Sequence, residues 1–184
     1  MTERTRLGVV LFIVSEANFF LLLICAYVFY HRSGGQGPAA ASSLDVFRTG
    51  LFSLALFSSS ATVWRAGVHL KKGRRAKVRR WLLATIVLGA VFLAGQAREY
   101  AHLLREHVTI SRDLFGTTFF TLTGFHGLHV FLGLVMLSIL FGITLSGSDR
   151  EPTAPALDGV SLYWHFVDVV WVFIFAIVYL WKFV

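Results

Sequence analysis

The chain has few of the residues on which secreted and catalytic folds depend. Its 184 residues include one cysteine, Cys25, and three prolines. One cysteine excludes an internal disulfide, and within an apolar run Cys25 is expected to pack as a small hydrophobe. The sequence has no Gly-rich phosphate loop, nucleophile elbow or pair of catalytic acids. It also has no zinc, iron–sulfur or haem-attachment spacing, and no repeat that would indicate an inverted-repeat transporter.

Long runs of apolar residues make up most of the sequence. Hydrophobic residues make up 56% of the chain, and the mean hydropathy is +0.69. A bilayer core of about 30 Å needs ~20 helical residues to cross it. The sequence therefore predicts an all-α integral membrane protein, a five-transmembrane-helix bundle that forms one domain over residues 1–184. The expected spans are residues 7–30, 47–70, 81–97, 117–145 and 160–184, with a proline-containing loop at 146–158 before the last.

Charge is distributed unevenly along this chain of net charge +7. The segment KKGRRAKVRR, residues 71–80, holds seven of the 17 basic residues and no acid. In a soluble protein it would suggest nucleic acid, but a basic loop between two spans is typical of the cytoplasmic side. We therefore expect no nucleic-acid partner, a cytoplasmic N-terminus and a periplasmic or external C-terminus. The loop could also attract anionic lipid headgroups. The first apolar run is too long for a signal peptide and should be retained.

Five ionisable residues lie inside the apolar runs, where a central charge costs ~2.5–3.5 kcal/mol. They are Glu16, His126, His129, His165 and Asp168. His126 and His129 share a helix face, as do His165 and Asp168, so that a His–Asp contact would hold the acid. At ~1.5 Å per residue, Glu16, His129 and Asp168 reach a similar depth. The sequence predicts that these side chains form an interhelical polar layer.

Two roles are open for these residues. Histidines can ligate a metal or haem, but no cysteine accompanies them, and we favour hydrogen bonds between helices. Glu16 is either a neutral packing residue, a lipid-associated group or part of a proton relay. For Asp168 we favour a structural role. On these grounds alone, the chain could be an integral subunit of a larger complex, or a small transporter or channel.

Several stretches of the sequence indicate a protein family, because they resemble cytochrome c oxidase subunit III. FGTTFFTLTGFHGLHVFLG (115–133) is similar to the sixth helix of that family, and LYWHFVDVVWVFIFAIVYLW (162–181) to its last. VVLFIVSEANFF followed by AYVFYH (9–31) resembles the third helix, and GQAREY (95–100) with TIS (109–111) the approach to the sixth. The order and spacing agree over about residues 7–181.

The resemblance implies subunit III of an aerobic haem–copper terminal oxidase, an aa3-type cytochrome c oxidase in a bacterial inner (plasma) membrane. Such complexes reduce oxygen to water and pump protons. This subunit is expected to bind no cofactor, with haem a and copper in partner subunits. Expected partners are subunit I by direct packing, subunit II, other small subunits, phospholipids and a respiratory supercomplex. The alternative is subunit III of a quinol oxidase, or a relative associated with nitric oxide reductase.

The resemblance also assigns roles to residues. Glu16 matches an intramembrane carboxylate near the proton-uptake side and a lipid cleft. His126, His129, His165 and Asp168 match helix-packing positions. The chain departs from the seven-helix pattern because the first two helices, which form the other arm of the lipid cleft, have no counterpart in this sequence.

Overall fold

Five long helices make up the described part of the chain. The computed structural model describes residues 3–32, 45–110, 114–145 and 154–180. The helices are α1 (Glu3–Arg32), α3 (Val46–Lys71), α4 (Arg75–Arg105), α5 (Leu114–Leu145) and α6 (Ala154–Phe175), which continues as one π-helical turn, η1 (Ala176–Leu180). All five are long and apolar enough to cross a membrane. The prediction of an all-α protein with five spans is confirmed.

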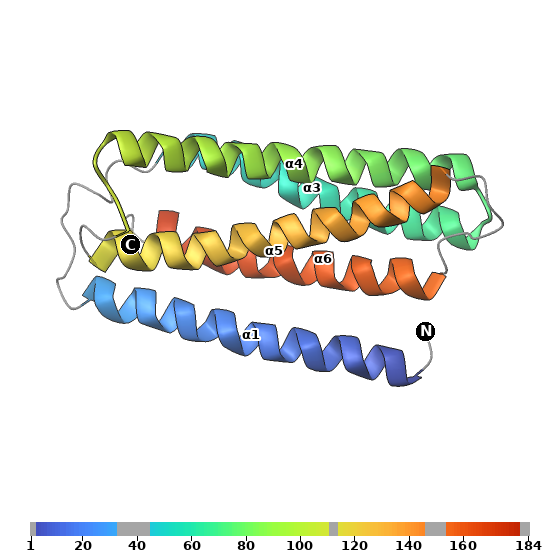
Figure 1. Ribbon diagram of the computed structural model, residues 1–184, viewed down its shortest axis with the longest axis horizontal. Coiled ribbons are helices and arrows are strands. Elements are labelled where there is room, and N and C mark those ends of the chain that lie inside the picture. The colour runs from blue at the N-terminus through green and yellow to red at the C-terminus, as the bar shows by residue number, and fades with distance from the viewer. Residues whose placement is uncertain (1–2, 33–44, 111–113, 146–153, 181–184) are drawn as a thin grey trace.

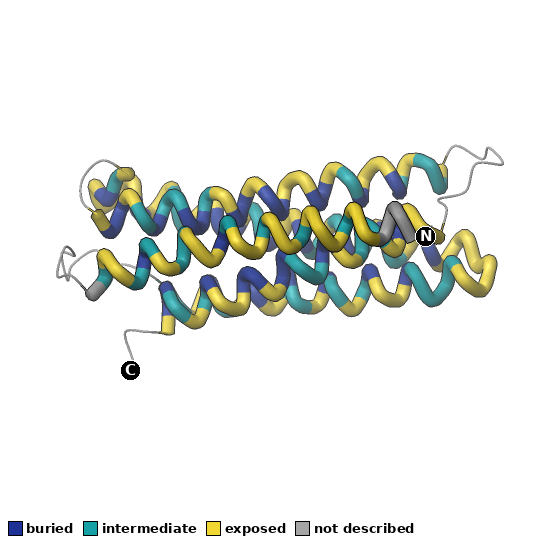
Figure 2. Tube along the Cα trace, turned by 90° about the horizontal axis from the view of Figure 1, so that it is seen from below, coloured by how far each residue is buried: buried dark blue, intermediate teal, exposed yellow. Residues whose placement is uncertain are grey.

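The helices lie side by side in three layers (Figure 1). The hairpin of α3 and α4 forms one layer, α5 and α6 form the middle one, and α1 forms the third. α4 packs on α5, α3 packs on α6, and α1 packs on both helices of the middle layer. Buried positions face the inside of the bundle, whereas long rows of exposed positions follow the outer surfaces (Figure 2).

The turn between α3 and α4 is tighter than the expected basic loop at residues 71–80. Gly73 has a φ of +63°, which glycine adopts at little cost. The Gly73 amide donates to Leu70 and the Arg74 amide donates to His69, so that two terminal carbonyls of α3 are satisfied. α4 begins directly afterwards at Arg75. Most of the basic segment is therefore helical, because Lys and Arg are good helix formers.

Two further boundaries extend beyond the predicted spans. α4 continues past 81–97 to Arg105 as a polar helical extension, which the sequence through His102 leads us to expect. α6 begins at Ala154, so the prediction of a loop reaching residue 158 is wrong. Pro155 stands in the first turn of α6, where its missing amide hydrogen costs no intrahelical bond. The predicted end of the last span, at 181–184, lies outside the described residues.

Glycines let one large side chain enter the centre of the bundle. The Trp164 ring of α6 is fully buried, and a Cβ on Gly89 of α4 would lie 2.8 Å from it. A Cβ on Gly133 of α5 would lie 2.7 Å from the same ring. Real Cβ atoms do not approach so closely, so these two glycines form the slot that holds Trp164. Small residues that allow close approach are typical of helix contacts in membranes.

α1 is held by a narrow seam. Its less exposed positions include a row spaced alternately by four and three residues, as in a coiled coil: Val9, Ile13, Glu16, Phe20, Leu23 and Tyr27. Among these, Phe20 and Tyr27 are buried. The opposite face is apolar and exposed, with Leu22 exposed by 70%. Cys25, expected to pack as a small hydrophobe, is also exposed and lies outside the buried core.

Candidate functional site

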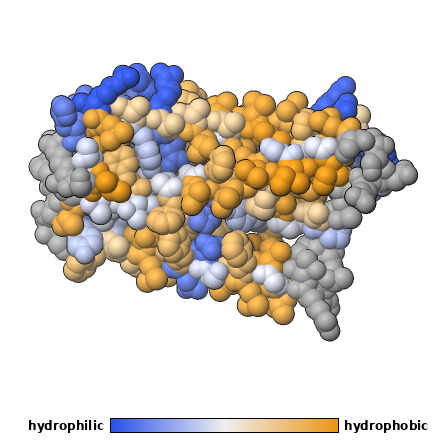
Figure 3. All heavy atoms as spheres, in the orientation of Figure 1, coloured by the Kyte–Doolittle hydropathy of each residue, from blue (hydrophilic) through white to orange (hydrophobic). Residues whose placement is uncertain are grey.

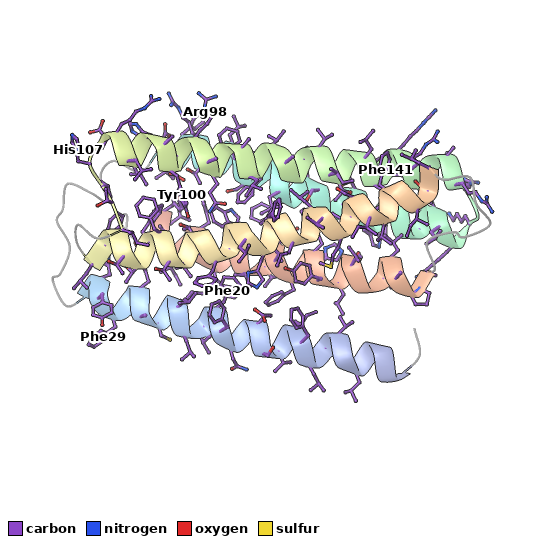
Figure 4. All side chains as sticks on the ribbon, in the orientation of Figure 1. Phe20, Phe29, Arg98, Tyr100, His107 and Phe141 are labelled. Atoms are coloured by element: carbon purple, nitrogen blue, oxygen red, sulfur yellow. The ribbon has the colours of Figure 1, made fainter. Side chains whose placement is uncertain are left out.

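The polar side chains inside the bundle form several separate links between helices. The first joins α1 to α5: Glu16 Oε2 lies 2.9 Å from His129 Nε2. Neither side chain is open to the surroundings, with exposures of 22% for Glu16 and 10% for His129. The Phe20 ring lies beside His129, with ring centroids 4.9 Å apart in an edge-on arrangement, and Figure 4 shows Phe20 between α1 and the middle layer. These are two of the three residues that the depth estimate placed at a common level; the third, Asp168, lies in a different link.

The hydrogen bonds of His129 fix how many protons this pair holds. His129 Nδ1 lies 2.7 Å from the carbonyl oxygen of Phe125, which can only accept, so Nδ1 carries a hydrogen. The contact between Nε2 and Glu16 then needs one more proton. It belongs either to an imidazolium facing a carboxylate or to a carboxyl group facing a neutral imidazole. Both arrangements leave the pair without net charge, which reduces the cost of placing it in a bilayer.

A second link joins α3 to α6. Ser60 Oγ lies 2.8 Å from His165 Nδ1, and the same hydroxyl donates to Asp168 Oδ2. Because the hydroxyl hydrogen goes to the carboxylate, Nδ1 of His165 must donate to the serine oxygen. Ser60 thus connects the imidazole and the acid that the sequence placed on one helix face. No hydrogen bond between described residues connects this group with Glu16 and His129, so the predicted layer consists of two separate parts.

His126 differs from the other histidines. It is fully buried, and neither of its ring nitrogens has a hydrogen-bond partner among the described residues. Its ring stacks on Trp171, with centroids 4.8 Å apart, and meets the edge of Phe92 at 5.9 Å. Aromatic rings therefore enclose His126 from α4 and α6. The contacts of this imidazole are those of a packing group.

Serines on α3 bind indoles on α6, partners that the sequence reasoning did not name. Trp171 Nε1 donates to Ser53 Oγ and Trp164 Nε1 donates to Ser59 Oγ, each at 2.8 Å. The two tryptophans are seven residues apart and the two serines are six residues apart. The earlier tryptophan pairs with the later serine, as expected for antiparallel helices. Small hydroxylated residues such as these let membrane helices approach closely and bond across the contact. The buried indole N–H groups, which need an acceptor, were the signal that could have identified the partners.

Two further polar links tie α4 to its neighbours. Glu99 accepts hydrogen bonds from Thr49 of α3 at 3.0 Å and from Tyr179 of η1 at 2.6 Å. Tyr100 Oη lies 2.7 Å from Thr123 Oγ1 of α5, and Tyr100 is labelled in Figure 4. Both residues belong to GQAREY, where the sequence gave no reason to expect buried contacts. Their partners lie up to 80 residues away along the chain.

Metal ligation was the open alternative for the histidines. Within the described ranges, no three His, Cys, Asp or Glu side chains come together as a group that could hold an ion. The chemistry that the arrangement supports is the sharing of protons within hydrogen-bonded pairs and the joining of helices.

Known proteins resemble this chain over nearly its whole length. The family model for cytochrome c oxidase subunit III matches residues 1–183. A protein of Corynebacterium diphtheriae named cytochrome c oxidase subunit 3 is 39% identical over 177 residues, covering 94% of this chain and 85% of the relative. The proteins of the same name from Synechocystis sp. and Bacillus subtilis are each 38% identical over 175 residues, covering 94% and 95% of this chain and 74% and 84% of the relatives. The chain therefore belongs to the cytochrome c oxidase subunit III family.

Proposed function

We propose that this chain is a non-catalytic subunit of an aa3-type cytochrome c oxidase in a bacterial plasma membrane. In this assignment the chain packs on subunit I, beside subunit II and further small subunits, while partner subunits hold haem a and copper. The whole complex passes electrons from cytochrome c to oxygen and pumps protons. The names of the relatives support the choice of cytochrome c over quinol. The observation that carries the supporting role is the Glu16–His129 pair, which links helices and holds one proton.

Co-purification tests this assignment. The complex extracted with mild detergent through a tag on this chain should contain an a-type haem subunit and a subunit with a copper pair. Optical spectra and mass spectrometry of the subunits identify both. Companions with b- or o-type haem and no copper pair would move the chain to a quinol oxidase or a nitric oxide reductase assembly. A chain isolated without companions would contradict the proposal and favour a small transporter.

Glu16 is proposed to support proton supply during turnover. It is an acid within a membrane span, hydrogen-bonded to a group with which it can exchange a proton. The Glu16→Gln variant keeps a hydrogen bond to His129 but cannot exchange a proton. The initial rate of oxygen reduction should remain close to that of the parent complex, while activity should decay faster during sustained turnover. An unchanged decay in Glu16→Gln, with Asn18→Ala on the exposed side of α1 as control, would reduce Glu16 to a packing group.

A cytoplasmic N-terminus and a periplasmic C-terminus are the proposed orientation. The basic turn between α3 and α4 supports it, since basic segments stay on the cytoplasmic side. In a Cys25→Ser background, the Lys72→Cys variant should react with an impermeant thiol reagent only after the membrane is opened. Reaction in intact cells would reverse the orientation.

Residues 1–184 are proposed as one membrane domain. Side chains from all five helices contribute to a common core, which supports this proposal.

A further inference from the structure

We propose that the outer face of α4 binds an anionic phospholipid, whose phosphate lies against Arg98 and Arg105 and whose acyl chain follows the groove between α4 and α5. This site lies on the opposite side of the bundle from α1, beyond the middle layer (Figure 1). It comprises a polar pocket of about 550 Å³ between α3 and α4 and an apolar groove of about 760 Å³ between α4 and α5.

The pocket has more cations than acids. Arg48, Arg98, His102 and Arg105 line it together with two acids. Both acids already have partners: Asp45 pairs with Arg48 at 2.9 Å, and both carboxylate oxygens of Glu99 accept hydroxyl hydrogen bonds. Arg98 and Arg105 form no ion pair with any described residue and are exposed. Their guanidinium groups can therefore receive a phosphate, which they bind through paired N–H donors.

The arginines stand at the right depth for a lipid phosphate. The stretch 81–97 of α4 carries no charged residue, and Arg80 and Arg98 stand on either side of it. Seventeen residues at ~1.5 Å each span about 25 Å, close to the hydrocarbon core of about 30 Å. Arg98 therefore lies where the acyl chains meet the headgroups. Figure 4 shows this side chain directed away from the bundle, and Figure 3 shows a hydrophilic patch over the same end of α4.

An apolar groove on the flank of α4 that faces α5 could hold an acyl chain, and its lining on α4 ends at Ala97, the residue before Arg98. On α4 it is lined by Ile86, Leu93 and a row of alanines, and on α5 by Phe131, Leu134 and neighbouring apolar residues. Alanine side chains are short, so they leave a depression along this side of α4. From Ile86 to Ala97 the α4 side of the groove extends for about 17 Å, and one leaflet of the core is about 15 Å deep. The two arginines match the phosphate of an anionic lipid, and the apolar groove matches its acyl chain.

Photolabelling of the intact membrane complex tests the proposal. The complex is reconstituted in phosphatidylcholine vesicles that contain a small share of phosphatidylglycerol with a photoreactive group on its acyl chain. Mass spectrometry should find label within residues 86–97. In the Arg98→Gln/Arg105→Gln variant this labelling should fall roughly tenfold, as expected for the loss of charge-assisted hydrogen bonds. The matched control Arg79→Gln/Arg80→Gln removes the same charge at the other end of α4 and should leave the labelling unchanged.

Each other outcome overturns the proposal. An equal loss in both double variants would indicate general attraction to a basic surface. Equal labelling by a photoreactive phosphatidylcholine would remove the role of the anionic headgroup. Loss of label in excess inorganic phosphate would assign the pocket to a free anion. Crosslinks from the groove to another subunit would show that protein covers this face. The Ala94→Phe variant fills the groove and keeps both arginines, and it should lower the labelling; labelling that survives would place the acyl chain elsewhere.

Discussion

α6 and α1 both pack against the middle of this molecule, yet they are held in different ways. α6 joins α3 through two indole–hydroxyl hydrogen bonds and through Ser60, and its Trp164 fills a slot between two glycines. In the most apolar stretch of this span, 39% of the residues are buried. α1 is fixed by a narrow seam, by ring contacts such as Phe19 on Phe125, and by the hydrogen bond of Glu16 with His129, and only 6% of its corresponding stretch is buried.

The difference follows from how membrane helices associate. In lipid, apolar burial does not drive helices together, so close packing and hydrogen bonds decide which helices stay in contact. The α3–α6 contact has both, and we infer that it forms the rigid part of the subunit. α1 relies in part on one proton-sharing pair, so its position should respond to the state of Glu16. A large apolar face of α1 remains free for lipid or a neighbouring subunit.

The largest effect is expected at Trp164. The Trp164→Ala variant removes the buried ring from its slot between Gly89 and Gly133 and leaves Ser59 without its indole donor. The resulting cavity should lower the free energy of unfolding by about 3 kcal/mol. The matched control is Trp64→Ala on α3, where the ring is 62% exposed.

Unfolding in mixed detergent micelles measures the change in both variants. Trp64→Ala should stay within about 0.5 kcal/mol of the parent protein, as surface substitutions do. Equal losses in the two variants would mean that tryptophan contributes through the membrane interface rather than through the slot, and the contrast between α6 and α1 would lose its main support.

A smaller effect is expected at the link of α1. The Glu16→Ala variant leaves His129 Nε2 without its partner, at a cost of roughly 1–2 kcal/mol. Because this hydrogen bond joins α1 to α5, the loss should appear as faster hydrogen exchange in α1 and leave α3 and α6 unchanged. A double-mutant cycle with His129→Leu isolates the pair, and the two losses should not add. Additive losses, or faster exchange throughout the bundle, would contradict the view that α1 depends on this link.

The sequence predicted the helices better than their contacts. Five spans followed from apolar length, and depth alone placed Glu16 near His129, because both quantities depend only on counting along a helix. The link from Ser60 to His165 and Asp168 joins residues more than 100 positions apart. Which side chains meet depends on the rotation of each helix about its axis, and a local sequence pattern does not reveal that rotation. The π-helical turn after Phe175, which lets Tyr179 reach Glu99, was likewise not predictable.

The smallest expected effect tests whether the serines of α3 act through hydrogen bonds. Ser53→Ala removes the acceptor of Trp171 Nε1 but keeps the small size that close packing needs. Interhelical hydrogen bonds of this kind contribute about 0.6 kcal/mol on average, so the free energy of unfolding should fall by that amount. Ser58→Ala on the exposed side of α3 is the control and should have no effect. If Ser53→Ala is also neutral while Ser53→Leu disrupts the complex, then small size, and not hydrogen bonding, makes serine necessary at this contact.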